Sequence, residues 1–328
     1  SSRTRKRYNE GLSNVRLLIR TMDIREALKE RILILDGGMG TYIQQLGISY
    51  DGNNDALPLT HPDVLERIHK DYINAGSDIV CTCTFGANAV SQHGYGMSDR
   101  CYDMNVAGAQ IARKAANSCT DRKVWVMGSM GPSDKSLTII EMMMDPEETV
   151  TFDVLEDAYF IQAKGLIDGG VDGFIVETVT DGRNAVAALT ATNKAQQEKG
   201  TNLPVMLSAS IMNASGCIMT GMSLAELYDS VKDYNLMSFG LNCSFGANEL
   251  YPFIKEIAEK AECAISIYPN AGLPTAHGYD EKPCDTANAI TAMANDGLIN
   301  LAGGCCGTTP DHIREIKHHL EKIAPRKY

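Results

Sequence analysis

The sequence has no run that approaches the roughly 18 consecutive apolar residues of a membrane-spanning helix. It also lacks the apolar segment and the cleavage site of a secretory signal peptide. The chain nevertheless carries ten cysteines. Without a secretion signal, these favour a reducing cytosol, where clustered thiols act as metal ligands or catalytic groups. We therefore expect a cytoplasmic protein that does not enter a membrane.

Basic residues are also in short supply. Thirty lysines and arginines stand against 41 aspartates and glutamates, which gives a net charge of −11. Nucleic-acid-binding surfaces normally need a basic face, so we expect no nucleic-acid partner. Residues 1–22 depart from this balance with six basic residues and one acidic residue. We interpret them as a basic leader that is disordered or left over from cloning, and residues 23–328 as one domain.

Nucleotide-binding signatures are missing from the glycine-rich segment 37–40. It has neither the G-x-G-x-x-G pattern nor the lysine of a phosphate-binding loop. Nucleotides are therefore not expected as ligands, and we expect a small molecule of another kind.

Eight apolar runs alternate with eight amphipathic segments along the chain. We expect strands over residues 32–35, 78–84, 124–130, 173–177, 204–210, 237–243, 264–268 and 298–302. We expect helices over residues 61–75, 98–118, 151–168, 181–199, 223–233, 247–261, 285–296 and 310–323, after a short helix over 24–31. Most of the runs are continuously apolar, as in strands that are buried on both faces of a parallel sheet. The alternation predicts an α/β fold, a single (β/α)8 TIM barrel with a short N-terminal extension.

Two cysteines stand side by side near the C-terminal end, in the Gly-Gly-Cys-Cys-Gly segment 303–307. A third, Cys243, lies between an apolar run and a turn. Thiolates on a sharply turned backbone can reach one soft metal, and three protein ligands leave the fourth position of zinc open for chemistry. Active groups of a (β/α)8 barrel project from the C-terminal ends of its strands. We therefore predict a catalytic metal site on Cys243, Cys305 and Cys306.

Other candidate ligands are read as structural. The remaining cysteines are interpreted as small buried hydrophobic residues; they are Cys81, Cys83, Cys101, Cys119, Cys217, Cys263 and Cys284. Cys81 and Cys83 could present two sulfurs on one side of a strand, although their apolar setting favours packing. The seven histidines are interpreted as mostly surface or helical, and none as a ligand.

Two further strand ends carry polar or glycine residues that a buried strand would not otherwise need. Asp36, Gly37 and Gly38 follow the first expected strand. Glu177 ends the fourth. Free backbone N–H groups in the glycine turn could hold a carboxylate, while Asp36 and Glu177 could hold an ammonium group. A plain tight turn and a structural ion pair are the alternatives. The functional interpretation is a site that binds an amino acid beside a thiophilic metal.

Seven segments resemble the homocysteine S-methyltransferase family. They are LDGGMGT (35–41), DGNNDAL (51–57), AGSDIVCTCTF (75–85), AKGLIDGGVDGFIVET (163–178), GLNC (240–243), YPNAGLP (268–274) and GGCCGTTPDHIREI (303–316). The likeness runs from about Asp23 to Pro325. Within the family, the segments at 51–57 and 268–274 are most similar to the homocysteine-binding barrel of the cobalamin-dependent methionine synthases.

The resemblance implies a methyltransferase that converts homocysteine to methionine. It implies zinc on Cys243, Cys305 and Cys306, with the homocysteine thiolate as fourth ligand. It implies contacts of Asp36, Gly37, Gly38 and Glu177 with the amino-acid end of the substrate. The methyl donor would be methylcobalamin from elsewhere, because the chain shows no cobalamin-binding loop of the Asp-x-His-x-x-Gly type. The expected partners are therefore the cobalamin-binding and folate-binding domains of the same enzyme or a separate corrinoid protein.

Two alternatives remain open. One is a member of the same family that takes its methyl group directly from betaine or S-methylmethionine. The other, from a different class, is a non-catalytic zinc or thiol-redox protein. That second alternative requires a fourth protein ligand, for which the Cys81-x-Cys83 pair is the obvious source of sulfur.

Overall fold

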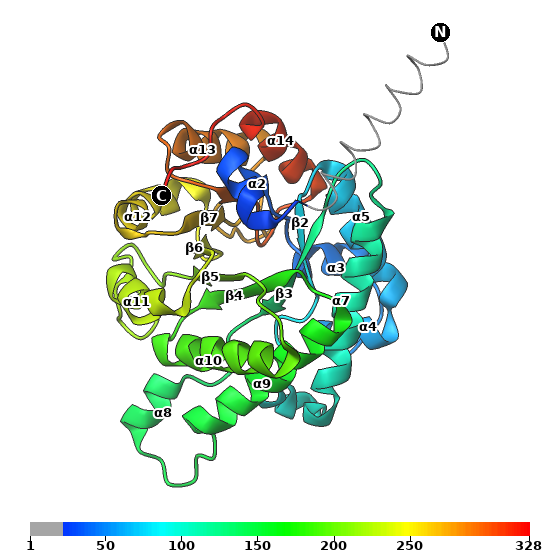
Figure 1. The fold of residues 1–328 in the computed structure, drawn as a ribbon, viewed down its shortest axis with the longest axis vertical. Helices are drawn as coiled ribbons and strands as arrows, with labels where there is room; N and C mark the ends of the chain where they lie inside the picture. Colours follow the sequence, from blue (N-terminus) through cyan, green and yellow to red (C-terminus); the bar gives the residue numbers. More distant parts are fainter. Residues whose placement is uncertain (1–21) are drawn as a thin grey trace.

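A computed structural model of the protein describes residues 22–328, so the basic leader lies almost wholly outside the described residues. One sheet of eight parallel strands runs in the order β1-β8-β7-β6-β5-β4-β3-β2. The strands are β1 (Leu33–Ile34), β2 (Ile79–Cys81), β3 (Trp125–Met130), β4 (Gly173–Val179), β5 (Val205–Ala209), β6 (Ser238–Asn242), β7 (Ala264–Tyr268) and β8 (Leu301–Ala302). The expected (β/α)8 barrel is confirmed, and Figure 1 shows the helices arranged around the sheet.

Residues 22–328 contain thirteen α-helices. They are α2 (Ile24–Glu30), α3 (Gly40–Leu46), α4 (Leu57–Thr60), α5 (Pro62–Ala75), α6 (Ala89–Gln92), α7 (Cys101–Ser118), α8 (Leu137–Met143), α9 (Phe152–Gly169), α10 (Gly182–Lys199), α11 (Leu224–Val231), α12 (Ala247–Lys260), α13 (Pro283–Asn295) and α14 (Pro310–Leu320). The expected helices are all present. Four others, α3, α4, α6 and α8, lie in the connections that follow β1, β2 and β3 and were not expected.

The interior of the barrel is filled by apolar side chains that also pack against α2. This helix contributes Ile24, Ala27 and Leu28. Asp23 caps it as expected, since its carboxylate accepts the N–H of Arg25 at 2.7 Å. Because α2 packs with Leu33 and Trp125, which begin their strands, it closes the N-terminal end of the barrel. The opposite end stays available for a site.

The seam between β1 and β2 is closed partly by side chains. Asp78 N donates to Ile34 O at 2.7 Å, and Ile34 N donates back to the Asp78 carboxylate at 2.8 Å. Farther along, Cys81 N donates to Asp36 Oδ2 at 2.9 Å. Carboxylates thus take the place of ladder carbonyls at this seam. This explains why β1 and β2 are shorter than the apolar runs predicted.

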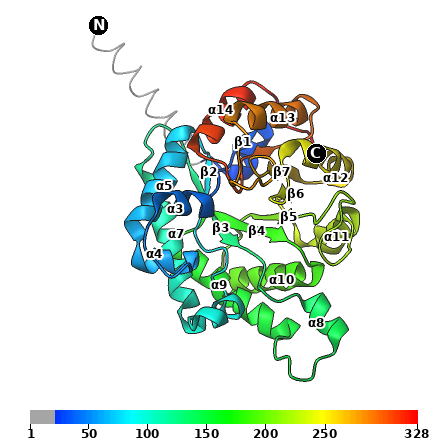
Figure 2. The same cartoon turned by 180° about the vertical axis from the view of Figure 1, so that it is seen from behind.

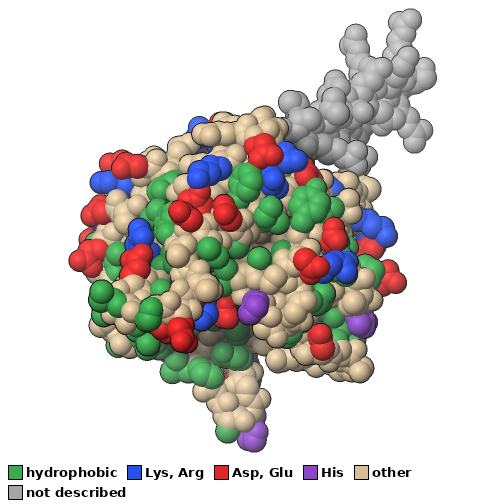
Figure 3. Space-filling view, turned by 90° about the horizontal axis from the view of Figure 1, so that it is seen from below, with side chains coloured by type: hydrophobic (Ala, Val, Ile, Leu, Met, Phe, Trp, Pro, Cys, Tyr) green, Lys and Arg blue, Asp and Glu red, His purple; other side chains and the backbone are tan. Residues whose placement is uncertain are grey.

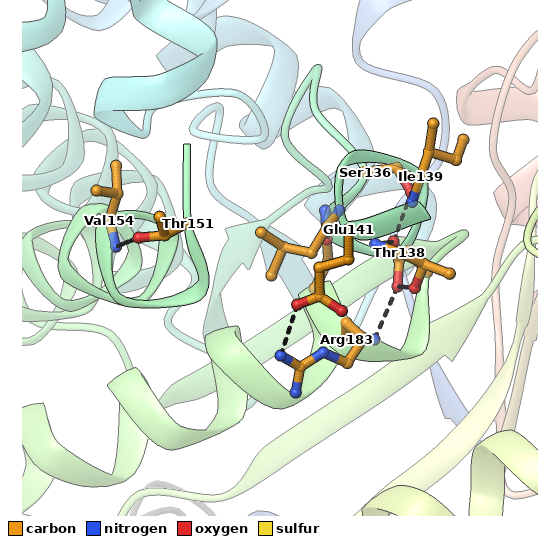
Figure 4. A network of polar contacts seen from close by, with 10 residues as sticks. Ser136, Thr138, Ile139, Glu141, Thr151, Val154 and Arg183 are labelled. Atoms are coloured by element: carbon orange, nitrogen blue, oxygen red, sulfur yellow. Dashed lines mark hydrogen bonds and ion pairs between the residues drawn. The ribbon is translucent and has the colours of Figure 1, made fainter. Parts of the chain in front are cut away.

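Helix α8 projects from the barrel beside α9 and α10, as Figures 1 and 2 show. Ser136 caps its N-terminal end, and an ion pair of 2.8 Å between Glu141 and Arg183 of α10 ties its last turn to α10 (Figure 4). Figure 4 also shows Thr151, whose side chain caps α9 by accepting the N–H of Val154 at 3.3 Å. The tip of this projection carries strongly exposed methionines. These are Met142, Met143 and Met144.

Two further observations concern the surface and the helices. Figure 3 shows basic and acidic side chains interspersed on one face of the molecule, without a continuous basic patch there. Over residues 22–328, no helix combines the length and the apolar character needed to cross a membrane.

Candidate metal and substrate site

The three cysteines of the expected metal site converge at the open end of the barrel. Cys243 directly follows β6, and Cys305 and Cys306 follow β8. Their sulfur atoms all lie within 4.8 Å of one another, and Cys243 Sγ is 3.9 Å from Cys306 Sγ. Each of the three residues is partly exposed. A set of soft sulfur donors that converge in this way fits a zinc ion.

Backbone contacts hold the three cysteines in place. Cys243 has a left-handed backbone with φ of +60°, and its N–H donates to the carbonyl of Tyr268 at 3.2 Å. Cys306 N donates to the side-chain oxygen of Asn270 at 3.1 Å. A Cβ at Gly304 would lie 2.4 Å from Thr308 Oγ1, so only glycine fits before the cysteine pair. The glycine before the cysteine pair is therefore required by packing.

The thiols are electrostatically linked. Hydrogen bonds from Cys305 and Cys306 to the Cys243 sulfur lower the pKa of Cys243. The same contacts with Cys243 raise the pKa of Cys305 and of Cys306. Without a cation the cluster therefore favours a single thiolate, since further negative charges would repel one another. A divalent cation would favour the ionised form of all three.

A cavity of about 350 Å³ extends from the cysteines into the mouth of the barrel. All seven site residues expected from the sequence line it: Asp36, Gly37, Gly38, Glu177, Cys243, Cys305 and Cys306. Its lining contains carboxyl groups and thiols but no lysine, arginine or histidine among the described residues. A positive charge in this cavity would therefore have to come from a bound ligand or metal.

The carboxyl groups of Asp36 and Glu177 are held by neutral donors. Asp36 Oδ2 accepts Cys81 N–H, while Glu177 Oε1 accepts the Ser129 hydroxyl at 2.5 Å and Oε2 accepts that of Tyr268 at 3.2 Å. Burial raises the pKa of Asp36 to about 7 and that of Glu177 to about 7. A cation bound beside them would stabilise both ionised carboxylates. The arrangement suits an ammonium group.

The glycine turn differs in part from the expectation of free N–H groups. Gly38 N donates to Thr308 Oγ1 at 3.0 Å, so this group is already used within the protein. A Cβ at Gly37 would lie 2.7 Å from the Tyr72 ring, and one at Gly38 would lie 2.8 Å from the carbonyl oxygen of Cys305. The two glycines thus let the turn after β1 pack against the cysteine segment. This packing is a role that the sequence alone did not indicate.

Several lining residues were missed by the sequence interpretation. Ser129 and Tyr268, which hold Glu177, lie within or at the end of apolar runs that were read only as strands. A serine in an otherwise apolar buried strand is the signal that could have revealed the first. Cys81 and Cys83 both line the cavity, yet they are not part of the cysteine cluster. Phe85, which is 42% exposed, stands at the rim.

This chain matches a known protein family and is similar in structure to solved proteins. A family model described as homocysteine S-methyltransferase matches residues 33–320. The homocysteine methyltransferase MmuM from Escherichia coli has a similar structure at 19% sequence identity. The likeness covers 88% of this chain and 95% of MmuM in its oxidized form, with a TM-score of 0.70, and 88% and 96% for the metallated form, with a TM-score of 0.69. At this identity the structures show a shared fold. The family match covers most of the chain, and the protein belongs to the homocysteine S-methyltransferase family.

Proposed function

We propose that this protein binds homocysteine at a zinc ion held by Cys243, Cys305 and Cys306 and activates it for methyl transfer. The observation that carries the proposal is the composition of one cavity. Three converging thiols and the carboxyl groups of Asp36 and Glu177 line it, with no cationic side chain in the lining. An amino acid with a thiol side chain complements both kinds of group.

The cysteine cluster supplies the metal part of the site. Three protein sulfurs leave one position of a tetrahedral metal for the substrate. Zinc bound there would keep the thiol of homocysteine, whose ordinary pKa is about 8.5, in its ionised and nucleophilic form near neutral pH.

The amino-acid end of the substrate is assigned to the other side of the cavity. Asp36 and Glu177 accept charge-assisted hydrogen bonds from the ammonium group. The Ser129 and Tyr268 hydroxyls keep the Glu177 carboxylate oriented and do not compete as cations. With Gly38 N–H committed to Thr308, the N–H of Gly37 is the donor that we assign to the substrate carboxylate.

The methyl transfer itself is a displacement at carbon. The substrate sulfur forms a bond to the methyl carbon, the bond between the methyl group and its donor breaks, and the electron pair of that bond remains with the donor. The product is methionine. The residues of this chain contribute by holding the thiolate and the ammonium group so that the sulfur faces the open mouth of the barrel.

We assign the methyl donor to methylcobalamin carried on another domain, beside a folate-binding domain, or on a separate corrinoid protein. Exposed apolar side chains around the mouth support a bulky, protein-borne donor. Phe85 is 42% exposed and Leu273 is 48% exposed, on the connections after β2 and β7. The second candidate donors, betaine and S-methylmethionine, are small and would reach the same sulfur directly. Supplying each donor in turn and measuring methionine distinguishes them.

A non-catalytic zinc protein fits less well. It requires four protein ligands, whereas the only group of candidate ligands found in residues 22–328 holds three.

All ten cysteines are free thiols, which supports a reducing compartment such as the cytoplasm.

X-ray absorption at the zinc edge, with and without homocysteine, tests the proposal. We expect three sulfur neighbours around zinc in the free protein and four with homocysteine. A fourth protein sulfur in the free protein, or an unchanged shell on addition of homocysteine, would contradict it. Homocysteine binding should also release close to one proton per site near pH 7, because the thiol is ionised on binding.

A further inference from the structure

Three non-glycine residues at the mouth of the barrel have a left-handed backbone. They are Thr178, with φ of +55°, Cys243, with φ of +60°, and Ser244, with φ of +64°. Thr178 directly follows Glu177 in β4, and Cys243 follows the last residue of β6. Such conformations are unfavourable for residues with a Cβ and persist where their surroundings impose them. Two of the four strand ends that carry the candidate site, those of β4 and β6, are therefore held under constraint.

The constraint in β4 is a bulge. Val176 pairs with Leu207 of β5, and the next pair joins Val179 to Ala209. Between these pairs β4 has one more residue than β5. Consecutive residues of a regular strand point to opposite faces. Ile175 and Glu177 line the cavity by this alternation, and the bulge brings Thr178 into the lining as well. The backbone directly after Glu177 therefore departs from regular strand geometry.

One buried amide side chain holds this bulge. Asn242, the last residue of β6, is 1% exposed. Its Oδ1 accepts the N–H of Thr178 at 3.1 Å and the hydroxyl of Ser208 at 2.6 Å. Its Nδ2 donates to Thr178 Oγ1 at 2.9 Å. The amide therefore reaches from β6 past β5 to grip both polar groups of the left-handed residue in β4.

We infer that Asn242 is a positioning residue for recognition of the substrate ammonium group: it holds Thr178, the bulged residue directly after Glu177, and so fixes where the Glu177 carboxyl group lies in the cavity. The inference rests on the proposed function, in which Glu177 binds that ammonium group. Asn242 also immediately precedes Cys243, so it links the end of the strand that carries a thiol to the end that carries the carboxyl group. Through its hydrogen bonds to Ser208 of β5 and Thr178 of β4, it fixes the spacing between the strand end that carries Cys243 and the strand end that carries Glu177.

Two ligands separate this role from a general structural one. Homocysteine and 4-mercaptobutanoate differ only in the ammonium group, which the second lacks. We expect wild-type protein, loaded with zinc, to prefer homocysteine by about tenfold or more, as a charge-assisted hydrogen bond in a buried site provides. Glu177→Gln should remove most of this preference. Asn242→Ala should remove it to a similar extent, while the affinity for 4-mercaptobutanoate and the zinc content stay close to wild type.

The double variant and a rescue variant sharpen the test. Because both residues act through one carboxyl group, Asn242→Ala should change the preference no further in the Glu177→Gln background. Thr178→Gly should restore part of the preference to Asn242→Ala, since glycine adopts a left-handed backbone without a clamp. Asn300→Ala is the matched control. Asn300 is a wholly buried asparagine just before β8, at the other end of the barrel, and its loss should alter stability but not the preference.

Calorimetric titration of the full chain with each ligand gives the preference, and metal analysis and circular dichroism check zinc and folding. If Asn242→Ala does not fold, the same titrations are made on Asn242→Ser and on the double variant Asn242→Ala/Thr178→Gly. If Glu177→Gln abolishes the preference and Asn242→Ala retains it, the positioning role is wrong while the proposed function stands. If Glu177→Gln itself retains the preference, the assignment of the ammonium group to Glu177 is wrong, and the role of Asn242 falls with it.

Discussion

At the scale of single residues, the candidate site is built from side chains whose ionisation depends on their neighbours. The turns after β6 and β8 bring the sulfur atoms of Cys243, Cys305 and Cys306 within 4.8 Å of one another. Their pKa values then move in opposite directions because they share protons. The cluster is thus prepared for a cation that allows all three sulfurs to ionise.

Replacing any of these three cysteines by serine should abolish stoichiometric zinc and homocysteine-dependent methyl transfer. The barrel should remain folded, because all three side chains are partly exposed at its mouth and only Cys305 packs against the apolar interior. Metal analysis, methionine formation and circular dichroism check these outcomes. Cys119→Ser and Cys284→Ala are the controls and should keep both zinc and activity. Full zinc content in all three variants of the cluster would remove these residues from the metal site.

At the scale of elements, one buried carboxylate joins the starts of two helices, α8 and α10. The turn before α10 carries Asp181, which is 1% exposed. Its carboxylate accepts from Arg183 N at 2.8 Å in α10 and from the Ser136 hydroxyl at 2.5 Å and Thr138 N at 2.9 Å in α8. One side chain therefore caps α10 and fixes the base of α8. This explains how α8 can project with an exposed apolar tip and still keep an ordered start.

Asp181→Ala should lower the free energy of unfolding by about 2–3 kcal/mol, from the lost helix cap and the lost hydrogen bonds to α8. It should also make residues 133–150 more sensitive to thermolysin. Urea unfolding and limited proteolysis measure the two effects. Asp181→Asn retains an acceptor and should lie between the wild type and the alanine variant. Equal proteolysis of all three proteins would show that α8 is held by other contacts.

Helix α5 carries a second element-scale feature, His69. It was expected at a surface or helical position, and it is helical but wholly buried, with neither ring nitrogen hydrogen-bonded. Burial lowers the pKa of His69 from 6.5 to about 4. The unfolded chain therefore binds a proton that the folded one excludes between these values. Through this residue stability is full above pH 6.5 and declines as the pH falls toward 4.

The pH dependence gives a measurable outcome for His69→Leu. Wild-type protein should lose up to about 3 kcal/mol of unfolding free energy through this residue between pH 7 and pH 4, and the leucine variant should lose that much less. Urea unfolding at several pH values measures it, with a chelator in every sample so that zinc loss does not contribute. His318→Gln, at a side chain that is 76% exposed, should behave as wild type. Parallel pH profiles for wild type and His69→Leu would contradict the prediction.

At the scale of the whole molecule, the barrel depends on closing the seam between its first two strands. Asp78 is central to that seam. Its carboxylate accepts the Ile34 N–H and forms a two-pronged ion pair with Arg31 at 2.8 and 2.9 Å. Asp78 is 4% exposed and Ile34 is 3% exposed, so no water is available to replace the carboxylate at the Ile34 N–H.

Asp78→Ala should destabilise the protein by about 2–3 kcal/mol, mainly because the buried Ile34 N–H loses its acceptor. The Arg31 side chain is 48% exposed, so solvent screens its share of the ion pair. Asp78→Asn keeps an acceptor for Ile34 and should cost less than the alanine variant. Urea unfolding followed by two probes, tryptophan fluorescence and circular dichroism, tests whether the loss is global. Trp125 packs in the barrel interior next to α2 and reports on it. A wild-type midpoint for Asp78→Ala would show that the seam is closed by other means.

The architecture and most of the candidate site could be predicted before the structure. Continuous apolar runs alternate with helical segments, and that pattern is sufficient for a parallel (β/α)8 barrel because strand burial on both faces leaves few other solutions. Strand ends in such a barrel meet at one mouth. The residues Asp36, Glu177 and Cys243 could therefore be placed together from their positions alone.

Other features required the folded chain, because they depend on contacts between segments far apart in sequence. The expected free N–H of Gly38 is taken by Thr308, which lies 270 positions away. The β4 bulge depends on Asn242 and Ser208 from other strands, and no local pattern in Val176-Glu177-Thr178 announces it. Composition and periodicity set which elements form and in what order, since these follow from local burial and backbone preferences. How the backbone bends directly after Glu177, and which thiols share a proton, was decided only when distant strands met.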